Sequence, residues 1–212
     1  MKVITLSCSP SRKRNSDTML DNFISGMREY SKDLEIEKIY LEDVPIKLYR
    51  FENRLGPESN ESAFRNLTDK IMGADGLVIA TPTYNFGVPA HLKNFIDRIR
   101  FFALDFDNQT ILNQPKGMLD YLKTYYIVSG GTPSWAQKIL FFAFPPFWLR
   151  SVFLYYGADC MGALYTGNVR AFENQRILNI CHKRGKKFAK HLINKKQQAL
   201  PERIFWRPPQ VD

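Results

Sequence analysis

Short apolar runs alternate along the chain with longer stretches in which apolar residues recur at helical spacing. The short runs are rich in Val, Ile and Leu, which favours β-strands. The run at 34–40 alternates apolar with polar residues and predicts an edge strand, whereas the unbroken run at 76–80 predicts a buried central one. The predicted strands cover residues 3–6, 34–40, 76–80, 122–128 and 158–165.

The stretches between these runs predict amphipathic helices. The first begins near Ser16 and carries Met19, Phe23 and Met27 on one apolar stripe, which we interpret as core packing. Further helices are predicted over 61–72, 89–102 and 173–194. Strands that alternate with helices are typical of βαβ units, so the sequence predicts an α/β fold, a doubly wound parallel sheet with helices on both faces.

Length, net charge and cysteine content limit the number of domains and the classes of partner that we expect. The length of 212 residues favours one domain, which we place at 1–198, followed by a Pro-containing tail at 199–212. The net charge of +9 favours an anionic partner of some kind. Three cysteines without paired spacing argue against a disulfide framework or a metal site, and we expect a reduced, cytoplasmic compartment. The sequence has no run of 18 apolar residues, so it predicts no membrane-spanning helix.

The loop at 7–18 joins a predicted strand to a helix N-terminus, where free N–H groups and the helix dipole favour an anion. It matches neither GxGxxG nor GxxxxGK[ST]. An alternative is a polar turn in which Asn15 or Ser16 caps the helix. Asp17 would repel a phosphate unless its carboxylate points away. The side chains that could donate to phosphate oxygens are Ser9, Ser11, Arg12, Arg14, Ser16 and Thr18.

Two more loops leave predicted strand ends. In 81–89, two prolines and a glycine hold an irregular backbone whose amides could hydrogen-bond a flat heteroaromatic ring, with Tyr84 and Phe86 stacking on it. In 129–132, Gly130 and Gly131 let the backbone approach a ligand closely. Each loop alone could be an ordinary turn. Because ligands of parallel sheets bind outside the carboxyl ends of strands, the three loops together predict a mononucleotide with a flat ring, namely FMN.

Residues 73–98, GADGLVIATPTYNFGVPAHLKNFIDR, carry a more specific signal. They resemble the pattern ADGIVxxTPxYNxxxPxxLKxxIDR of the NAD(P)H-dependent FMN reductase and quinone reductase family, within the flavodoxin-like superfamily. The loop at 7–18 resembles the family's GSPRxxSNT more weakly. The resemblance extends from residue 1 to about 170. It implies a flavodoxin-like five-stranded parallel sheet of order 2-1-3-4-5 and non-covalent FMN.

The resemblance also assigns site residues. One group would hold the phosphate: Ser9, Ser11, Arg12, Asn15, Ser16 and Thr18. A second group would hold the isoalloxazine from one side, with Gly130 and Gly131 on the other: Pro82, Thr83, Tyr84, Asn85 and Phe86. Relatives with an iron–sulfur cluster carry cysteines after the second strand, but 44–60 has none. Family members are usually dimers, with the helix at 93–98 near the partner.

The implied activity is hydride transfer from NADH or NADPH to bound FMN, and then to a flavin, a quinone or a similar small-molecule acceptor. We expect no catalytic side chain, because the flavin carries the redox chemistry. One alternative is a flavodoxin-like FMN electron carrier without NAD(P)H activity of its own, although such carriers tend to be acidic. Another is a basic interaction protein at a membrane surface that has lost the cofactor.

Two segments leave alternatives open. The aromatic segment at 138–156, KILFFAFPPFWLRSVFLYY, predicts a buried helix broken at Pro145 and Pro146. It could instead form an aromatic wall over the flavin, or make weak contact with a membrane surface. The basic stretch at 182–196, HKRGKKFAKHLINKK, predicts a solvated helix face. We expect no nucleic-acid partner, because Phe188 is the only aromatic residue interleaved with these charges.

Overall fold

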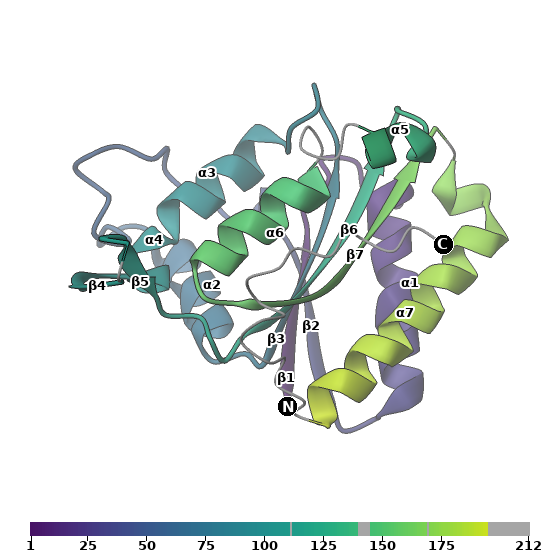
Figure 1. Ribbon diagram of the computed structural model, residues 1–212, viewed down its shortest axis with the longest axis horizontal. Helices are drawn as coiled ribbons and strands as arrows, with labels where there is room; N and C mark the ends of the chain where they lie inside the picture. The colour runs from purple at the N-terminus through teal and green to yellow at the C-terminus, as the bar shows by residue number, and fades with distance from the viewer. Residues whose placement is uncertain (111, 140–144, 169, 195–212) are drawn as a thin grey trace.

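The computed structural model describes residues 1–110, 112–139, 145–168 and 170–194. Its centre is a five-stranded parallel sheet of order β2-β1-β3-β6-β7 (Figure 1). Because β6 and β7 are the fourth and fifth strands of this sheet, the order is the implied 2-1-3-4-5, and the flavodoxin-like fold is confirmed. The strands are β1 (Lys2–Ser7), β2 (Glu35–Tyr40), β3 (Gly76–Pro82), β6 (Lys123–Gly130) and β7 (Asp159–Gly167). The predicted tail at 199–212 lies outside the described residues.

Side chains of the central strands point alternately to the two faces of the sheet. In β3, Leu77 and Ile79 pack into one hydrophobic cluster, while Val78 and Ala80 pack into the other. All four side chains are fully buried, as the unbroken apolar run at 76–80 predicts. The edge strand β2 is mostly half-buried, as its alternating pattern predicts.

Helices cover both faces of the sheet (Figure 1). The pair α1 and α7 packs on one face, and α2, α3 and α6 pack on the other. The α-helices are α1 (Asn15–Tyr30), α2 (Ser62–Met72), α3 (Ala90–Arg98), α4 (Arg100–Ala103), α5 (Ser134–Ile139), α6 (Pro145–Tyr155) and α7 (Gln175–Ile193). The short 3-10 helices are η1 (Leu41–Asp43) and η3 (Ala171–Glu173).

Helices α1 and α7 approach each other through two glycines. A Cβ on Gly26 would lie 2.0 Å from the carbonyl oxygen of His182, and one on Gly185 would lie 2.0 Å from that of Phe23. Glu29 pairs with His182 and, at 2.6 Å, with Lys186 across the same contact. This packing fixes the position of α1, whose N-terminus faces the carboxyl edge of the sheet.

The structure departs from the predicted elements in three places. The helix expected at 89–102 is interrupted at Ile99, which separates α3 from α4. A hairpin of β4 (Leu104–Gln109) and β5 (Pro115–Gly117) was not predicted, because its exposed strands lack an apolar run. Helix α6 begins at Pro145, where a missing N–H costs nothing, so both prolines stand in its first turn. Residues 140–144 lie outside the described residues.

Candidate functional site

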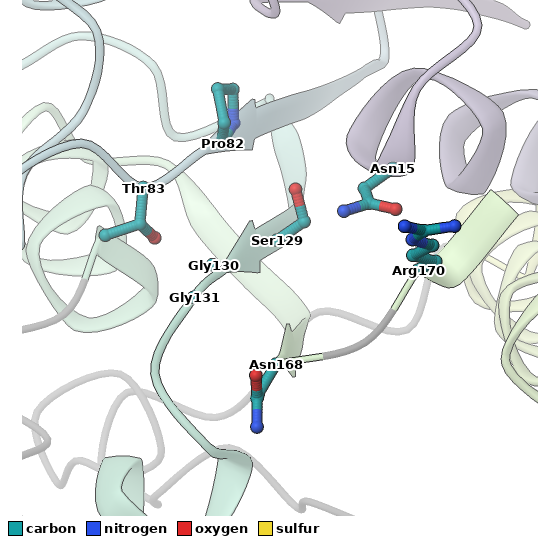
Figure 2. Close-up of a pocket in the computed structure, with 8 residues that line it drawn as sticks. All are labelled: Asn15, Pro82, Thr83, Ser129, Gly130, Gly131, Asn168 and Arg170. Atoms are coloured by element: carbon teal, nitrogen blue, oxygen red, sulfur yellow. The ribbon is translucent and has the colours of Figure 1, made fainter.

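A cleft of about 500 Å³ opens at the carboxyl edge of the sheet (Figure 2). It lies between the ends of β3, β6 and β7 and the start of α1, which is where parallel sheets bind their ligands. The residues that line it are Asn15, Pro82, Thr83, Ser129, Gly130, Gly131, Asn168 and Arg170. The cleft therefore brings together members of all three predicted loops.

The β3 and β6 side of the cleft is built closely around Gly130. The Thr83 amide donates to the Ser129 carbonyl at 2.7 Å, which joins the two strand ends. The Tyr165 hydroxyl donates to the Thr132 carbonyl at 3.0 Å behind them. A Cβ at Gly130 would lie 2.5 Å from the Tyr165 hydroxyl and 3.2 Å from Thr83 Oγ1. Position 130 therefore requires glycine, because any larger residue would clash with Tyr165 and project into the cleft.

The wall contains one polar atom without a hydrogen-bond partner among the described residues, Thr83 Oγ1. The oxygen is buried and has no hydrogen-bond partner within the described part of the chain. Thr83 lines the cleft, on the same side as Gly130 and Gly131 (Figure 2). A buried hydroxyl without a partner costs free energy, and this one belongs to a residue that lines the cleft.

The predicted aromatic loop forms a tight turn at the rim. The Tyr84 amide donates to the Gly87 carbonyl at 3.0 Å, and the Gly87 amide donates back at 2.8 Å. Asn85 and Phe86, between them, have φ angles of 49° and 64°, the left-handed region. Tyr84 and Phe86 are about half exposed. The turn holds Tyr84, Asn85 and Phe86 beside the cleft, and none of the three lines its wall.

The Asp17 carboxylate is fully buried and does not line the cleft. Its buried carboxylate accepts hydrogen bonds from Ser7 Oγ and the Lys13 amide, both at 2.7 Å, and pairs with Lys38 at 2.7 Å. Burial by itself raises the pKa of Asp17, but the hydrogen bonds from Lys38, Lys13 and Ser7 outweigh it and hold the pKa below its ordinary value. The carboxylate thus ties the loop to β1 and β2.

Two other predicted phosphate ligands, Ser9 and Arg12, already have partners within the protein. Ser9 Oγ donates to the Ser11 carbonyl at 3.0 Å. Arg12 donates to both carboxylate oxygens of Asp43, at 2.5 and 2.6 Å, and lies 4.3 Å from the Tyr40 ring centroid. Ser16 and Thr18 lie in the first turn of α1, where Ser16 is buried and Thr18 half-buried. Ser9, Ser11, Arg12, Ser16 and Thr18 do not line the cleft in this structure.

Asn15 is the member of the first loop that reaches the cleft. Its Oδ1 accepts a hydrogen bond from the Ala171 amide at 2.8 Å, so it clamps η3 and does not cap α1. Asn168 and Arg170, which follow β7, also line the cleft and were missed by the sequence reasoning. The available signal was their position: they are polar residues directly after the last predicted strand.

Three further features of the described part of the chain concern metal-binding groups, cysteines and membrane-spanning helices. Among the residues that the structure describes, no group of three or more His, Cys, Asp or Glu side chains could hold a metal ion. Cys8, Cys160 and Cys181 are free thiols, and burial is the main reason why each pKa lies above its ordinary value. Over the same described ranges, no helix has both the length and the apolar character needed to cross a bilayer.

The sequence model of the NADPH-dependent FMN reductase family matches residues 1–142, two thirds of the chain. This chain belongs to the FMN reductase family. The match confirms the resemblance predicted from residues 73–98.

Relatives and neighbours agree with this membership. An FMN-dependent NADH:quinone oxidoreductase of Metamycoplasma arthritidis is 33% identical over 138 residues, which cover 63% of this chain and 70% of the relative. One of Thiobacillus denitrificans is 43% identical over 88 residues, but the match spans only 38% of this chain and 42% of that protein. An FMN-dependent NADH-azoreductase of Bacillus anthracis, solved in complex with FMN, is 18% identical with a TM-score of 0.64, covering 90% of this chain and 98% of that one. At this identity the last match shows the shared fold.

Proposed function

We propose that this chain is an FMN-dependent NAD(P)H oxidoreductase that passes reducing equivalents to a flavin, a quinone or a similar small-molecule acceptor. The observation that carries the proposal is the cleft, in which a low backbone wall at β3 and β6 faces the N-terminus of α1. Its lining is therefore suited to a ligand with a flat ring at one end and an anion at the other. Family membership and the named relatives support the same function.

The wall at β3 and β6 fits the ring of FMN. Gly130 leaves the space that a Cβ would fill, and Thr83 Oγ1 offers a buried hydrogen-bonding group that the protein itself does not use. The ring lies along this wall, where Gly130 and Gly131 adjoin residues 82–86, namely Pro82, Thr83, Tyr84, Asn85 and Phe86. The family resemblance implied opposite sides of the ring for the two groups, but the hydrogen bond from Thr83 to Ser129 places them side by side. Tyr84 and Phe86 shield it from solvent at the rim.

The phosphate end of FMN lies at the start of α1. The free N–H groups of the first helical turn favour an anion there. Asp17 is buried and paired, so it does not oppose the phosphate. The proposed contacts come from the loop and the first turn, namely Ser9, Ser11, Arg12, Asn15, Ser16 and Thr18; those already bonded within the loop would have to share or exchange partners.

Bound FMN supplies the hydride chemistry, accepting from NADH or NADPH and donating to the acceptor. The residues of this chain bind and orient the ring and leave one of its faces open to both substrates in turn. No side chain is assigned a catalytic role. We also propose that the protein is cytoplasmic, because free cysteines favour a reducing compartment. We propose one domain at residues 1–198. Any contact with a membrane surface is expected to be weak.

We further propose that the chain forms a homodimer through the region around α3. Leu48, Phe51 and Leu55 are 70–77% exposed on the loop that packs against this helix. Arg98 of α3 holds that loop through hydrogen bonds to the Lys47 and Gly56 carbonyls. A fixed loop that exposes large apolar side chains is typical of an interface. Phe51→Asp should shift the protein towards monomer in sedimentation velocity, and an unchanged profile would remove this surface from the proposal.

The activity is tested by absorption spectroscopy without oxygen. The purified protein, supplied with FMN and freed of excess, should show a flavin spectrum that bleaches within seconds of adding NADH or NADPH. Free FMN with the same nicotinamide is the control, and added quinone should restore the oxidised spectrum. FMN that binds but stays oxidised would favour the electron carrier, and failure to bind FMN would refute the proposed function.

A further inference from the structure

The two ends of the cleft differ in charge. Arg170 is the only formally charged side chain among the described residues that line it, and no carboxylate lines it. Its guanidinium lies beside the side chain of Asn15, across the cleft from Thr83 (Figure 2). The cleft is therefore cationic at the end that faces α1, and uncharged at the β3 and β6 wall.

The position of Arg170 is set by the clamp between α1 and η3. Asn15 Oδ1 accepts the Ala171 amide at 2.8 Å, so the residue before Ala171 is held beside the first turn of α1. That turn presents N–H groups without intrahelical partners, and its dipole favours negative charge. A guanidinium next to such a helix start adds donors in a planar fork that suits phosphate oxygens.

Neither arginine of the β1–α1 loop lines the cleft. Arg12 pairs with Asp43, as described above. Arg14 lies 5.5 Å from the ring centroid of Phe172. Arg170 forms only a weak ion pair. Its guanidinium nitrogen lies 3.6 Å from a carboxylate oxygen of Glu173, and both side chains are more than half exposed. Exposed pairs at such a distance contribute little free energy, so a ligand phosphate can replace Glu173.

We propose that Arg170 binds the phosphate group of FMN and gives the cleft its preference for FMN over unphosphorylated riboflavin. This inference rests on the proposed function. It adds a charged phosphate contact from the segment after β7 to the Arg12 contact that the family resemblance implies. It predicts that flavin selectivity depends on a residue outside the matched region 1–142.

The test compares dissociation constants for FMN and riboflavin, measured by flavin fluorescence in wild type and in Arg170→Gln. Losing a charge-assisted contact should weaken FMN binding about 10- to 100-fold. Riboflavin binding should change less than about 3-fold, because it carries no phosphate. The FMN affinity of Arg170→Gln should also depend less on salt than that of wild type.

Two further variants sharpen the experiment. Arg176→Gln removes the same charge from an exposed position on α7 outside the cleft lining, and should leave both affinities unchanged. Glu173→Gln removes the competing carboxylate and should tighten FMN binding up to a few-fold. Equal losses for FMN and riboflavin in Arg170→Gln, or no loss for either, would overturn the inference alone. A wild type that binds neither flavin would overturn the proposed function together with the inference.

Discussion

The β1–α1 loop and the cleft wall at β3 and β6 lie at the same edge of the sheet but use their polar groups in opposite ways. In the loop, polar side chains bond groups of neighbouring elements of the protein: Asp17 pairs with Ser7 of β1 and Lys38 of β2, and Arg12 pairs with Asp43 of η1. In the wall, Thr83 Oγ1 is buried without a partner among the described residues.

This difference separates two functions that look alike in sequence. A polar residue whose partners are all within the protein stabilises a loop, whereas one left open in a cleft is available to a ligand. Substitutions in the loop should therefore act mainly on folding, and those in the wall mainly on ligand binding.

The largest expected effect is on the loop. Asp17→Ala removes the buried partner of Lys38 and leaves the Lys13 amide and Ser7 hydroxyl without their acceptor. We expect a loss of about 3 kcal/mol in the free energy of unfolding, measured by urea denaturation. Asp21→Ala is the matched control, because Asp21 pairs with the same Lys38 at 2.5 Å but is half exposed. It should cost less than about 1 kcal/mol, and equal losses would contradict the comparison.

The wall is tested next by Gly130→Ala. The new Cβ would displace the Tyr165 hydroxyl from the Thr132 carbonyl and occupy part of the cleft. We expect FMN affinity to fall at least about 10-fold, with a stability loss of about 1–2 kcal/mol from overpacking. Gly131→Ala is the stability control, because nothing lies within 4 Å of its Cβ position. The prediction fails if Gly130→Ala binds FMN as tightly as wild type.

The acid dependence of stability gives a second test of the loop. Because folding lowers the pKa of Asp17 below its ordinary value of 3.8, its stabilisation is complete above that pH and is lost as pH falls through the folded-state pKa. Asp17→Asn, which cannot titrate, should therefore lose stability less steeply than wild type below about pH 4. Chemical denaturation from pH 7 to pH 2.5 measures both curves. Parallel curves would show that Asp17 is not specially stabilised as the anion.

The smallest expected effect is that of a single hydroxyl. Thr83→Val keeps the shape of the wall but removes the buried, unpartnered Oγ1. Stability should be unchanged or slightly higher, while FMN affinity falls roughly 3- to 10-fold. Thr81→Val, whose buried hydroxyl donates to the Pro82 carbonyl at 3.0 Å, should instead lower stability by about 1 kcal/mol. A stability loss in Thr83→Val as large as in Thr81→Val would mean that Thr83 is structural.

Much of the fold was predictable because burial leaves a strong local signal. The run at 76–80 is apolar throughout because β3 is buried on both faces, and the apolar stripe of the first helix packs onto the sheet beside α7. The hairpin of β4 and β5 was missed because its exposed strands carry polar side chains. The break at Ile99 was missed because apolar residues continue on both sides of it.

The site was predicted in part, from a family motif. Thr83, Gly130, Gly131, Pro82 and Asn15 do line the cleft, although their contacts with FMN stay predictions. The sequence could not show that Arg12 is paired with Asp43, because that partner lies 31 positions away. Nor could it place Arg170, which reaches the cleft only because Asn15 clamps a segment 156 positions along the chain.

The sequence by itself determined the α/β class, the strand runs and the family, because hydrophobic periodicity and the motif at 73–98 are local properties of the chain. Only the tertiary structure decided which polar groups have hydrogen-bond partners within the protein and which do not. That distinction depends on partners brought together by the crossover connections of the sheet: Lys38 with Asp17, and the Ala171 amide with Asn15. A residue's identity states what it can donate or accept, and the fold determines whether a partner within the protein has already taken it.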